Sequence, residues 1–144
     1  MGTPHHFHTP IPFSLMAGIL CLMGTLLGCE KSQEDKLYGR WQFRYVEYPE
    51  GETLTSDSIF YSFDKGVFEL LKLDSDISST RKFGTYSVSA DSLSIAIPSP
   101  GSIDLQSAPY HFGSDNTKVF HIDEISRQTL LLSCRDTLYH FHKF

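Results

Sequence analysis

The chain has 144 residues, a formal net charge of −5 and an aromatic content of 13%. The length fits a single domain, and the aromatic residues are numerous enough to build one packed core. Acidic and basic side chains are scattered through the sequence without a basic stripe. This distribution argues against nucleic acid as a partner.

Residues 1–28 have the features of a secretory leader. An apolar run covers residues 13–28 and is shorter than the roughly 20 residues that a membrane-spanning helix needs, so it fits the apolar region of a signal peptide. A buried core helix is the alternative. The leader lacks the usual basic start, because His5, His6 and His8 carry little charge at neutral pH. Either this requirement is met weakly or translation starts at another position.

The leader ends in Leu26-Leu27-Gly28-Cys29, which resembles the lipobox of bacterial lipoproteins. The resemblance implies cleavage after Gly28 and two acyl chains, such as palmitate, on the Cys29 sulfur, with a third as an option on the new amine. A single myristoyl-type chain binds membranes only marginally, whereas two or three chains hold a protein stably. We therefore expect an anchor in a bacterial outer membrane, on its periplasmic face or at the cell surface.

Residues 29–36 are polar and lack an apolar period, so we expect a flexible tether there. This acidic segment with Ser and Gln also resembles export signals of surface lipoproteins of Bacteroidota, and a solvated linker is the alternative. After cleavage, Cys134 is the one cysteine besides the acylated Cys29. An intramolecular disulfide is therefore excluded, and the domain has to be held together by its core.

Residues 37–144 predict one antiparallel β-domain. Apolar and polar side chains alternate with a period of two, and Asp64-Lys65-Gly66 and Ala90-Asp91 mark tight turns. Prolines in residues 98–109 mark a long irregular connection, because proline cannot donate to a central ladder. The expected strands, about eight, cover 41–45, 59–63, 67–73, 84–88, 93–97, 119–125, 129–134 and 137–144.

Closure of this meander into a barrel would remove its exposed edges. We therefore expect an all-β barrel, with a two-sheet sandwich as the alternative. An eight-stranded barrel is just wide enough to be filled by side chains or to hold one small ligand. Large residues are expected to point inward and to favour a filled or narrow interior: Trp41, Phe43, Tyr45, Tyr61, Phe63, Tyr86, Tyr139 and Phe141.

Gly39-Arg40-Trp41 resembles the Gly-x-Trp motif that opens the first strand of lipocalins. In that family a basic residue near the end of the last strand packs across the tryptophan ring, and Lys143 occupies the comparable place. The pattern from Gly84 to Ile95 and the terminal Tyr-x-Phe-x-Lys resemble lipocalin-like lipoproteins of Bacteroidota. The resemblance implies a barrel closed by Trp41 and Lys143, whose interior holds an apolar ligand or is filled by side chains.

The pairs His121/Asp123 and His140/His142 each share a strand face, and imidazole and carboxylate groups suit zinc. If Arg135-Asp136 is a two-residue turn, His140 and His142 point away from the core. A solvated outer face is then expected, and no metal site and no cofactor are predicted.

No catalytic motif stands out. The sequence lacks a Gly-x-Ser-x-Gly elbow, a glycine-rich phosphate loop and a His-Glu-x-x-His pair. Cys134 is expected to be a small buried hydrophobe. An enzyme that uses the histidine face is the third and least supported hypothesis, because no spacing supports a mechanism.

The leading hypothesis is a non-enzymatic binding module with a small apolar or amphipathic ligand at the mouth of the barrel. The alternative is an interaction subunit that docks another envelope protein or a surface glycan. Loops on a rigid scaffold commonly carry recognition, so residues 74–80 and 98–117 are the candidate surfaces for that role.

Replacing Cys29 with Ala should abolish acylation and leave the precursor uncleaved, because processing depends on the modified thiol. Labelling with a clickable fatty acid and the mass of the N-terminal peptide measure both effects. A labelled Cys29→Ala protein, or a wild-type membrane form that starts before residue 29, would contradict the assignment.

Overall fold

The structure is a computed structural model that describes residue 2 and residues 32–144. The leader, the lipobox and Cys29 lie outside the described residues. Within the described part of the chain, no helix is both long and apolar enough to cross a membrane.

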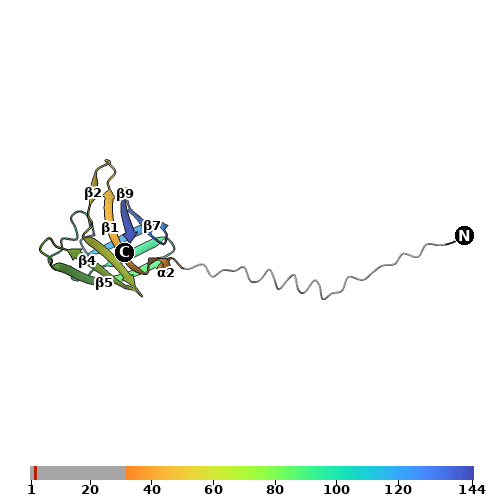
Figure 1. Cartoon of the computed structure of the whole chain (residues 1–144), viewed down its shortest axis with the longest axis horizontal. Helices are drawn as coiled ribbons and strands as arrows, with labels where there is room; N and C mark the ends of the chain where they lie inside the picture. The colour runs from red at the N-terminus through yellow and green to blue at the C-terminus, as the bar shows by residue number, and fades with distance from the viewer. Residues whose placement is uncertain (1, 3–31) are drawn as a thin grey trace. The chain divides into compact units, whose positions relative to one another are not determined.

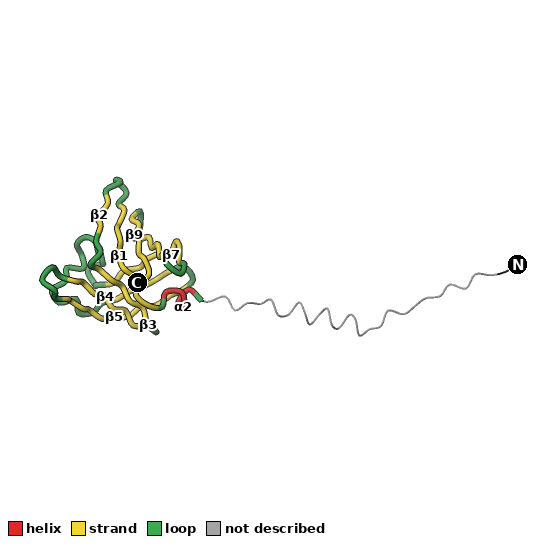
Figure 2. The backbone as a smooth tube through the Cα atoms, viewed as in Figure 1, coloured by secondary structure: helices red, strands yellow, loops and turns green. Residues whose placement is uncertain are grey.

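One antiparallel sheet contains every strand of the described residues (Figures 1 and 2). The strands are β1 (Gly39–Glu47), β2 (Thr53–Thr55), β3 (Ile59–Asp64), β4 (Val67–Leu73), β5 (Ser79–Ser89), β6 (Ser92–Ala96), β7 (Thr117–Ile125), β8 (Thr129–Cys134) and β9 (Thr137–Lys143). Strands β3 to β9 pair in chain order, and β1 pairs with both β3 and β9. The sheet therefore closes, which confirms the predicted barrel over the sandwich.

Strand β2 is an addition to the predicted set. It pairs with the end of β1, and the β1–β2 hairpin rises at the top of the domain in Figure 1. All three of its residues are exposed. A strand this short without a buried face has no alternation of apolar and polar residues, so the pattern did not predict it.

A short helix, α2 (Gln33–Leu37), covers one end of the barrel. The hydroxyl of Ser32 accepts a hydrogen bond from the Asp35 amide at 3.2 Å, which caps the helix. Leu37 is fully buried, and its carbonyl accepts a 2.8 Å hydrogen bond from Trp41 Nε1. Residues 33–36, predicted as part of a flexible tether, are therefore helical, because the cap and the buried leucine fix them.

We call the end that carries α2 the closed end. The side chain of Gln33 donates a hydrogen bond there to Asp91, in the turn between β5 and β6. The opposite end, which we call the open end, carries the connections 48–52, 74–78, 97–116 and 135–136. The strands run alternately between the two ends, as an antiparallel meander requires.

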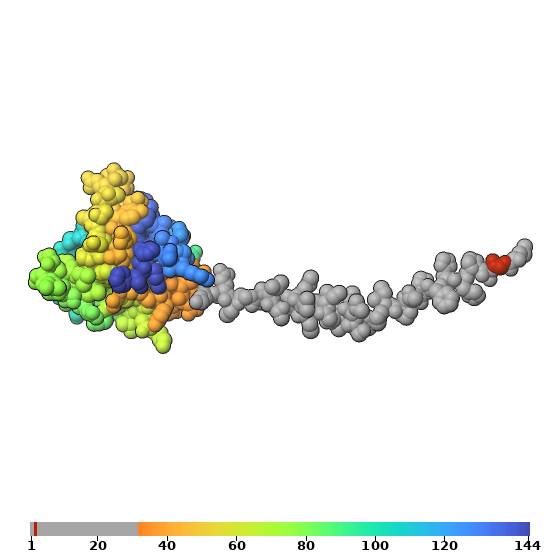
Figure 3. Space-filling view, in the orientation of Figure 1, coloured from red at the N-terminus to blue at the C-terminus, as the bar shows by residue number. Residues whose placement is uncertain are grey.

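The seam between β1 and β9 joins the two ends of the domain sequence. Trp41 pairs with Lys143 and Phe43 with Phe141. Lys143 Nζ lies 4.2 Å from the centroid of the Trp41 ring and donates a hydrogen bond to the carbonyl of Tyr38. In Figure 3 the C-terminal residues, in blue, lie beside the orange residues that begin the barrel.

A β-bulge in β1 reverses one predicted orientation. The register against β9 shifts between Phe43 and Tyr45, and a bulge moves the following side chains to the opposite face. Val46 is consequently the fully buried residue, whereas Tyr45 lies on the outer face, stacked on His140 with centroids 4.1 Å apart. The prediction of Tyr45 as an interior residue was wrong.

The other large residues predicted to point inward all belong to the buried core: Trp41, Phe43, Tyr61, Phe63, Tyr86, Tyr139 and Phe141. Their rings contact one another across the barrel. Phe141 lies 5.6 Å from Phe43 and 5.0 Å from Tyr61, and Phe63 lies 5.1 Å from Tyr86, between ring centroids. Aromatic side chains thus fill much of the interior. The ends of the barrel and its outer face are the surfaces left for binding.

We expect substitutions at two residues of the seam, Phe141 and Lys143, to change the free energy of unfolding by very different amounts. Phe141→Ala should lower the free energy of unfolding by about 3–5 kcal/mol, because it leaves a cavity between Phe43 and Tyr61. Lys143→Ala should cost only about 1 kcal/mol, the size of a partly exposed cation–π contact. Urea denaturation followed by Trp41 emission measures both. A chain lacking residues 139–144 that kept its native transition would show that β9 is dispensable.

Candidate functional site

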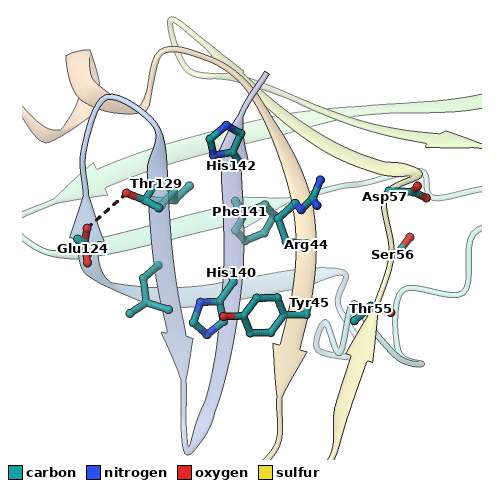
Figure 4. A pocket seen from close by; sticks show the side chains of 12 residues that line it. Arg44, Tyr45, Thr55, Ser56, Asp57, Glu124, Thr129, His140, Phe141 and His142 are labelled. Carbon is teal, nitrogen blue, oxygen red and sulfur yellow. Dashed lines mark hydrogen bonds between the residues drawn. The ribbon is translucent and has the colours of Figure 1, made fainter.

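Polar side chains line several hollows of the described domain, and two of these lie away from α2. The first, which we call the outer hollow, has a volume of about 1040 Å³. It lies on the outer face of β8, β9, β1 and the β2 region, and Figure 4 shows it from close by. Its lining consists of Arg44, Tyr45, Thr55, Ser56, Asp57, Glu124, Thr129, Leu130, Leu131, His140, Phe141 and His142.

The stacked rings of Tyr45 and His140 lie near the middle of the outer hollow (Figure 4). One wall holds Glu124, whose carboxylate accepts a 3.4 Å hydrogen bond from Thr129, and the other holds residues 55–57. Three strands, β8, β9 and β1, lie between Glu124 on β7 and Thr55 on β2. With neighbouring strands about 4.8 Å apart, the walls are about 19 Å from each other along the sheet. This spacing suits a broad partner better than a small molecule.

The predicted orientation of the histidines agrees with this face. His140 is half-buried and its Nε2 lies 3.3 Å from Glu47 Oε2, while His142 is exposed. His121 Nδ1 lies 3.3 Å from Asp123 Oδ1, but β8 separates β7 from β9. The two pairs are therefore not on neighbouring strands. Among residues 32–144, no group of three or more His, Cys, Asp or Glu side chains is placed to hold a metal ion.

The second hollow, which we call the mouth hollow, lies at the open end and has a volume of about 630 Å³. Its walls come from the connection after β1, the 97–116 connection, the start of β7 and the β8–β9 turn. The lining consists of Tyr48, Gln106, His111, Phe112, Gly113, Thr117, Lys118, Val119, Cys134, Arg135, Thr137 and Tyr139.

The 97–116 connection is anchored to the barrel, so the mouth hollow has a fixed wall. Ile103, Leu105, Tyr110 and Phe112 of this connection are all buried in the core. His111 is tied to the other side of the hollow, because its Nε2 is 2.9 Å from the Tyr48 hydroxyl. Prolines and glycines give this segment an irregular path, but its apolar side chains pack against the barrel core and hold it in place.

Lys118 is the one charged side chain that is buried among the described residues, with 4% exposure. It points inward because it shares a strand face with Phe120 and Ile122, which are also buried. Its Nζ donates a hydrogen bond to the carbonyl of Tyr110 and another, of 2.7 Å, to the hydroxyl of Tyr139. Within the described domain no carboxylate forms an ion pair with it.

Aromatic rings surround the Lys118 amine in place of a counter-ion. Nζ lies 4.0 Å from the ring centroid of Tyr139, 4.7 Å from that of Phe120 and 5.8 Å from that of Phe112. The negative faces of aromatic rings attract a cation, and the attraction grows when water is excluded. The rings thus offset part of the cost of burying the ammonium group, but within the described domain no negative charge neutralises it.

Burial dominates the protonation of this cluster. It lowers the pKa of Lys118 to about 7, although the nearby Cys134 has a smaller effect in the opposite direction. Burial, and then the charge of Lys118, lowers the pKa of His111. Burial also raises the pKa of Tyr110 to about 12 and raises that of Tyr139 further. Near neutral pH, Lys118 therefore exists in both its charged and its neutral form.

The structure brings few of the predicted site residues to the open end, where the mouth hollow lies. Tyr139 lines the mouth hollow, whereas Tyr45 and Phe141 line the outer hollow. Of the two predicted recognition loops, 98–117 contributes to the mouth hollow and 74–80 to neither. Cys134 is half-buried with a free thiol at the edge of the core.

Sequence reasoning missed Lys118, because the strand was expected to begin one residue later. The available signal was its place in the series 118, 120 and 122, whose other members are apolar.

Lys118 should leave a signature in the pH dependence of stability. Its folded pKa of about 7 is below its unfolded value near 10.5, so the unfolded chain binds the extra proton between these values and stability rises with pH. Compared with Lys118→Met, the wild-type protein should gain up to about 1.4 kcal/mol per pH unit between pH 7 and 9. Urea denaturation at several pH values measures the difference, and parallel curves for the two proteins would contradict it.

Comparisons with known proteins agree with the barrel. A lipocalin-like protein from Bacteroides uniformis ATCC 8492 has a crystal structure that superposes with a TM-score of 0.69 at 30% identity, covering 76% of this chain and 99% of that one. The crystal structure of an uncharacterized protein from Bacteroides eggerthii DSM 20697 gives a TM-score of 0.65 at 28% identity, with 75% and 99% covered. No curated protein matches the sequence.

The sequence model of the lipocalin-like domain matches residues 21–144, which is most of the chain. The chain therefore belongs to the lipocalin-like domain family.

Proposed function

We propose that this protein is a membrane-anchored, non-enzymatic binding module that holds a small amphipathic ligand in the mouth hollow. The observation that carries the proposal is the hollow itself. Its volume of about 630 Å³ falls in the range of about 300–1,000 Å³ that is typical of small-molecule sites. Apolar rings and a few converging polar groups line it, as such sites require. Membership of the lipocalin-like family supports a small ligand.

The filled interior limits how the ligand enters. Trp41, Phe43 and Phe120 are each at most 2% exposed, so the hollow ends above the aromatic core. A ligand in the mouth hollow therefore stays above the aromatic core and contacts the 97–116 connection. This arrangement suits a short ligand and not one that threads the whole barrel.

The anchor is proposed to be the acylated Cys29 in a bacterial outer membrane, on its periplasmic face or at the cell surface. The lipobox resemblance supports this, and both structural relatives come from Bacteroides species. Only three residues, 30–32, separate Cys29 from the start of α2, so the four residue steps reach at most about 14 Å. The closed end would then lie near the membrane, and the mouth hollow would face away from it.

A second candidate function is docking of a broad envelope partner, a protein or a surface glycan. The observation that favours it is the outer hollow, where Tyr45 and His140 present a stacked aromatic surface between two polar walls. Tyrosine is enriched at interfaces because its ring is apolar and its hydroxyl can hydrogen bond. The two candidates use different faces and can be tested separately.

A matched pair of substitutions tests the mouth hollow. In residues 30–144, sodium decanoate should shift amide resonances of Phe112, Thr137 and their neighbours, but not the Trp41 indole at the closed end. Thr137→Trp should block the mouth hollow and abolish these shifts, whereas Thr55→Trp, which fills the outer hollow, should leave them intact. This chain covers 99% of the crystallised Bacteroides uniformis chain with 76% of its own length, so we expect residues 30–144 to fold alone. Shifts confined to the outer hollow would contradict the proposal.

A further inference from the structure

The mouth hollow contains a buried amine whose hydrogen bonding is incomplete. A lysine ammonium has three N–H donors, and within the described domain Nζ of Lys118 donates to two acceptors, the Tyr110 carbonyl and the Tyr139 hydroxyl. The Tyr139 hydroxyl accepts that bond, and no other partner takes its own proton within residues 32–144. Two donors, one on nitrogen and one on oxygen, therefore remain side by side at the base of the hollow.

We propose that Lys118 and Tyr139 form a head-group site in the mouth hollow, and that the ligand is a small amphipathic carboxylic acid. Its carboxylate would accept one hydrogen bond from Nζ of Lys118 and one from the hydroxyl of Tyr139. This inference rests on the proposed function and deepens it, because it names the chemical class of the ligand.

The surroundings favour a carboxylate over other head groups. A buried charge without a partner is costly, and a carboxylate supplies both the missing acceptor and the missing negative charge. Charge-assisted hydrogen bonds of this type are about twice as strong as neutral ones. An alcohol would leave the ammonium uncompensated, and a cationic head group would be repelled by it.

The rest of the hollow favours an apolar body behind the acid. Phe112 is buried beside Nζ, and the Tyr48 ring packs edge to face against His111 with centroids 5.6 Å apart. A fully polar anion such as phosphate would meet a single ammonium and several rings. An aliphatic or aromatic acid instead covers the rings with its body while its carboxylate meets the amine.

The other ionisable groups that face the amine come from five parts of the chain. His111 and Tyr110 belong to the 97–116 connection, Cys134 to β8, Arg135 to the β8–β9 turn, Tyr139 to β9, and Tyr48 follows β1. Burial raises the pKa of all three tyrosines above 10, and the pKa of His111 is lowered below 6.5. Between pH 7 and 9 the three tyrosines and His111 keep the same charge, so Lys118 can be followed in that window. Cys134→Ser removes the thiol as an alternative source of the pH dependence.

The carboxylate binds the ammonium form, whereas free Lys118 loses its proton above about pH 7. Binding therefore takes up a proton, and affinity for an acid should fall by up to tenfold per pH unit above pH 7. Affinity for an uncharged alcohol of the same chain length should not fall in this way.

The test compares sodium decanoate with decan-1-ol on residues 30–144 by NMR titration, with folding of each variant checked by its thermal transition. Lys118→Met should weaken decanoate binding at least tenfold at pH 7 and leave decanol binding within threefold. Lys72→Met removes a cation from an exposed position on β4 that lines neither hollow, and should change decanoate binding less than threefold. Wild-type decanoate affinity should fall from pH 7 to 9, and should do so equally in Cys134→Ser.

A measurement on the wild-type protein protects the test against a variant that does not fold. The ¹³Cε resonance of Lys118 reports its titration directly, and saturation with decanoate should move the midpoint upward by at least one pH unit. Equal affinities for decanoate and decanol, a pH-independent decanoate affinity, or an unmoved Lys118 midpoint would overturn the head-group site while the mouth hollow remained a ligand site. Absence of binding by either compound would overturn both proposals.

Discussion

The pairing of β1 with β9 is the contact on which the rest of the structure depends. It joins Trp41 to Lys143 and Phe43 to Phe141, and it converts an open meander with two free edges into a closed barrel. Because these residues lie at opposite ends of the domain sequence, their pairing comes with a large loss of chain entropy. Burial of the aromatic rings along the seam offsets that loss. Strand β9 carries both the seam and the candidate site, because its Tyr139 reaches the Lys118 amine of β7 across the intervening β8.

The two ends of the barrel are sealed in different ways, which leaves one of them for recognition. At the closed end, α2 inserts Leu37, and backbone carbonyls accept hydrogen bonds from the Trp41 indole and the partly exposed Lys143 amine. At the open end, the 97–116 connection contributes apolar side chains, but Lys118 retains an unused donor beside a solvent-accessible hollow. An unsatisfied buried donor marks the end at which another molecule can complete the structure.

Much of this fold could be predicted from the sequence, because alternation of apolar and polar residues reports which side of a strand is buried. Most strands and the inward direction of Phe43 and Phe141 follow from that rule. Tyr45 does not, because a bulge depends on how β1 fits β9 and leaves no mark in the pattern of one strand. Lys118 was missed for a different reason. Lysine is usually exposed to solvent, and the burial of Lys118 depends on how the irregular 97–116 connection folds over the open end, which the alternation of residues does not report.

Stability alone does not account for a lysine at position 118. Burying an ammonium without a carboxylate is unfavourable, and replacing buried charges by apolar side chains of similar volume is often neutral or stabilising. Phe112, Phe120 and Tyr139 surround the side chain, and methionine also makes favourable contacts with aromatic rings. The protein instead holds the amine with a carbonyl, a hydroxyl and three aromatic faces, which fixes its position without neutralising it. A cation that is held in place but left unpaired is pre-organised for an anion, and this gives the mouth hollow its chemical selectivity.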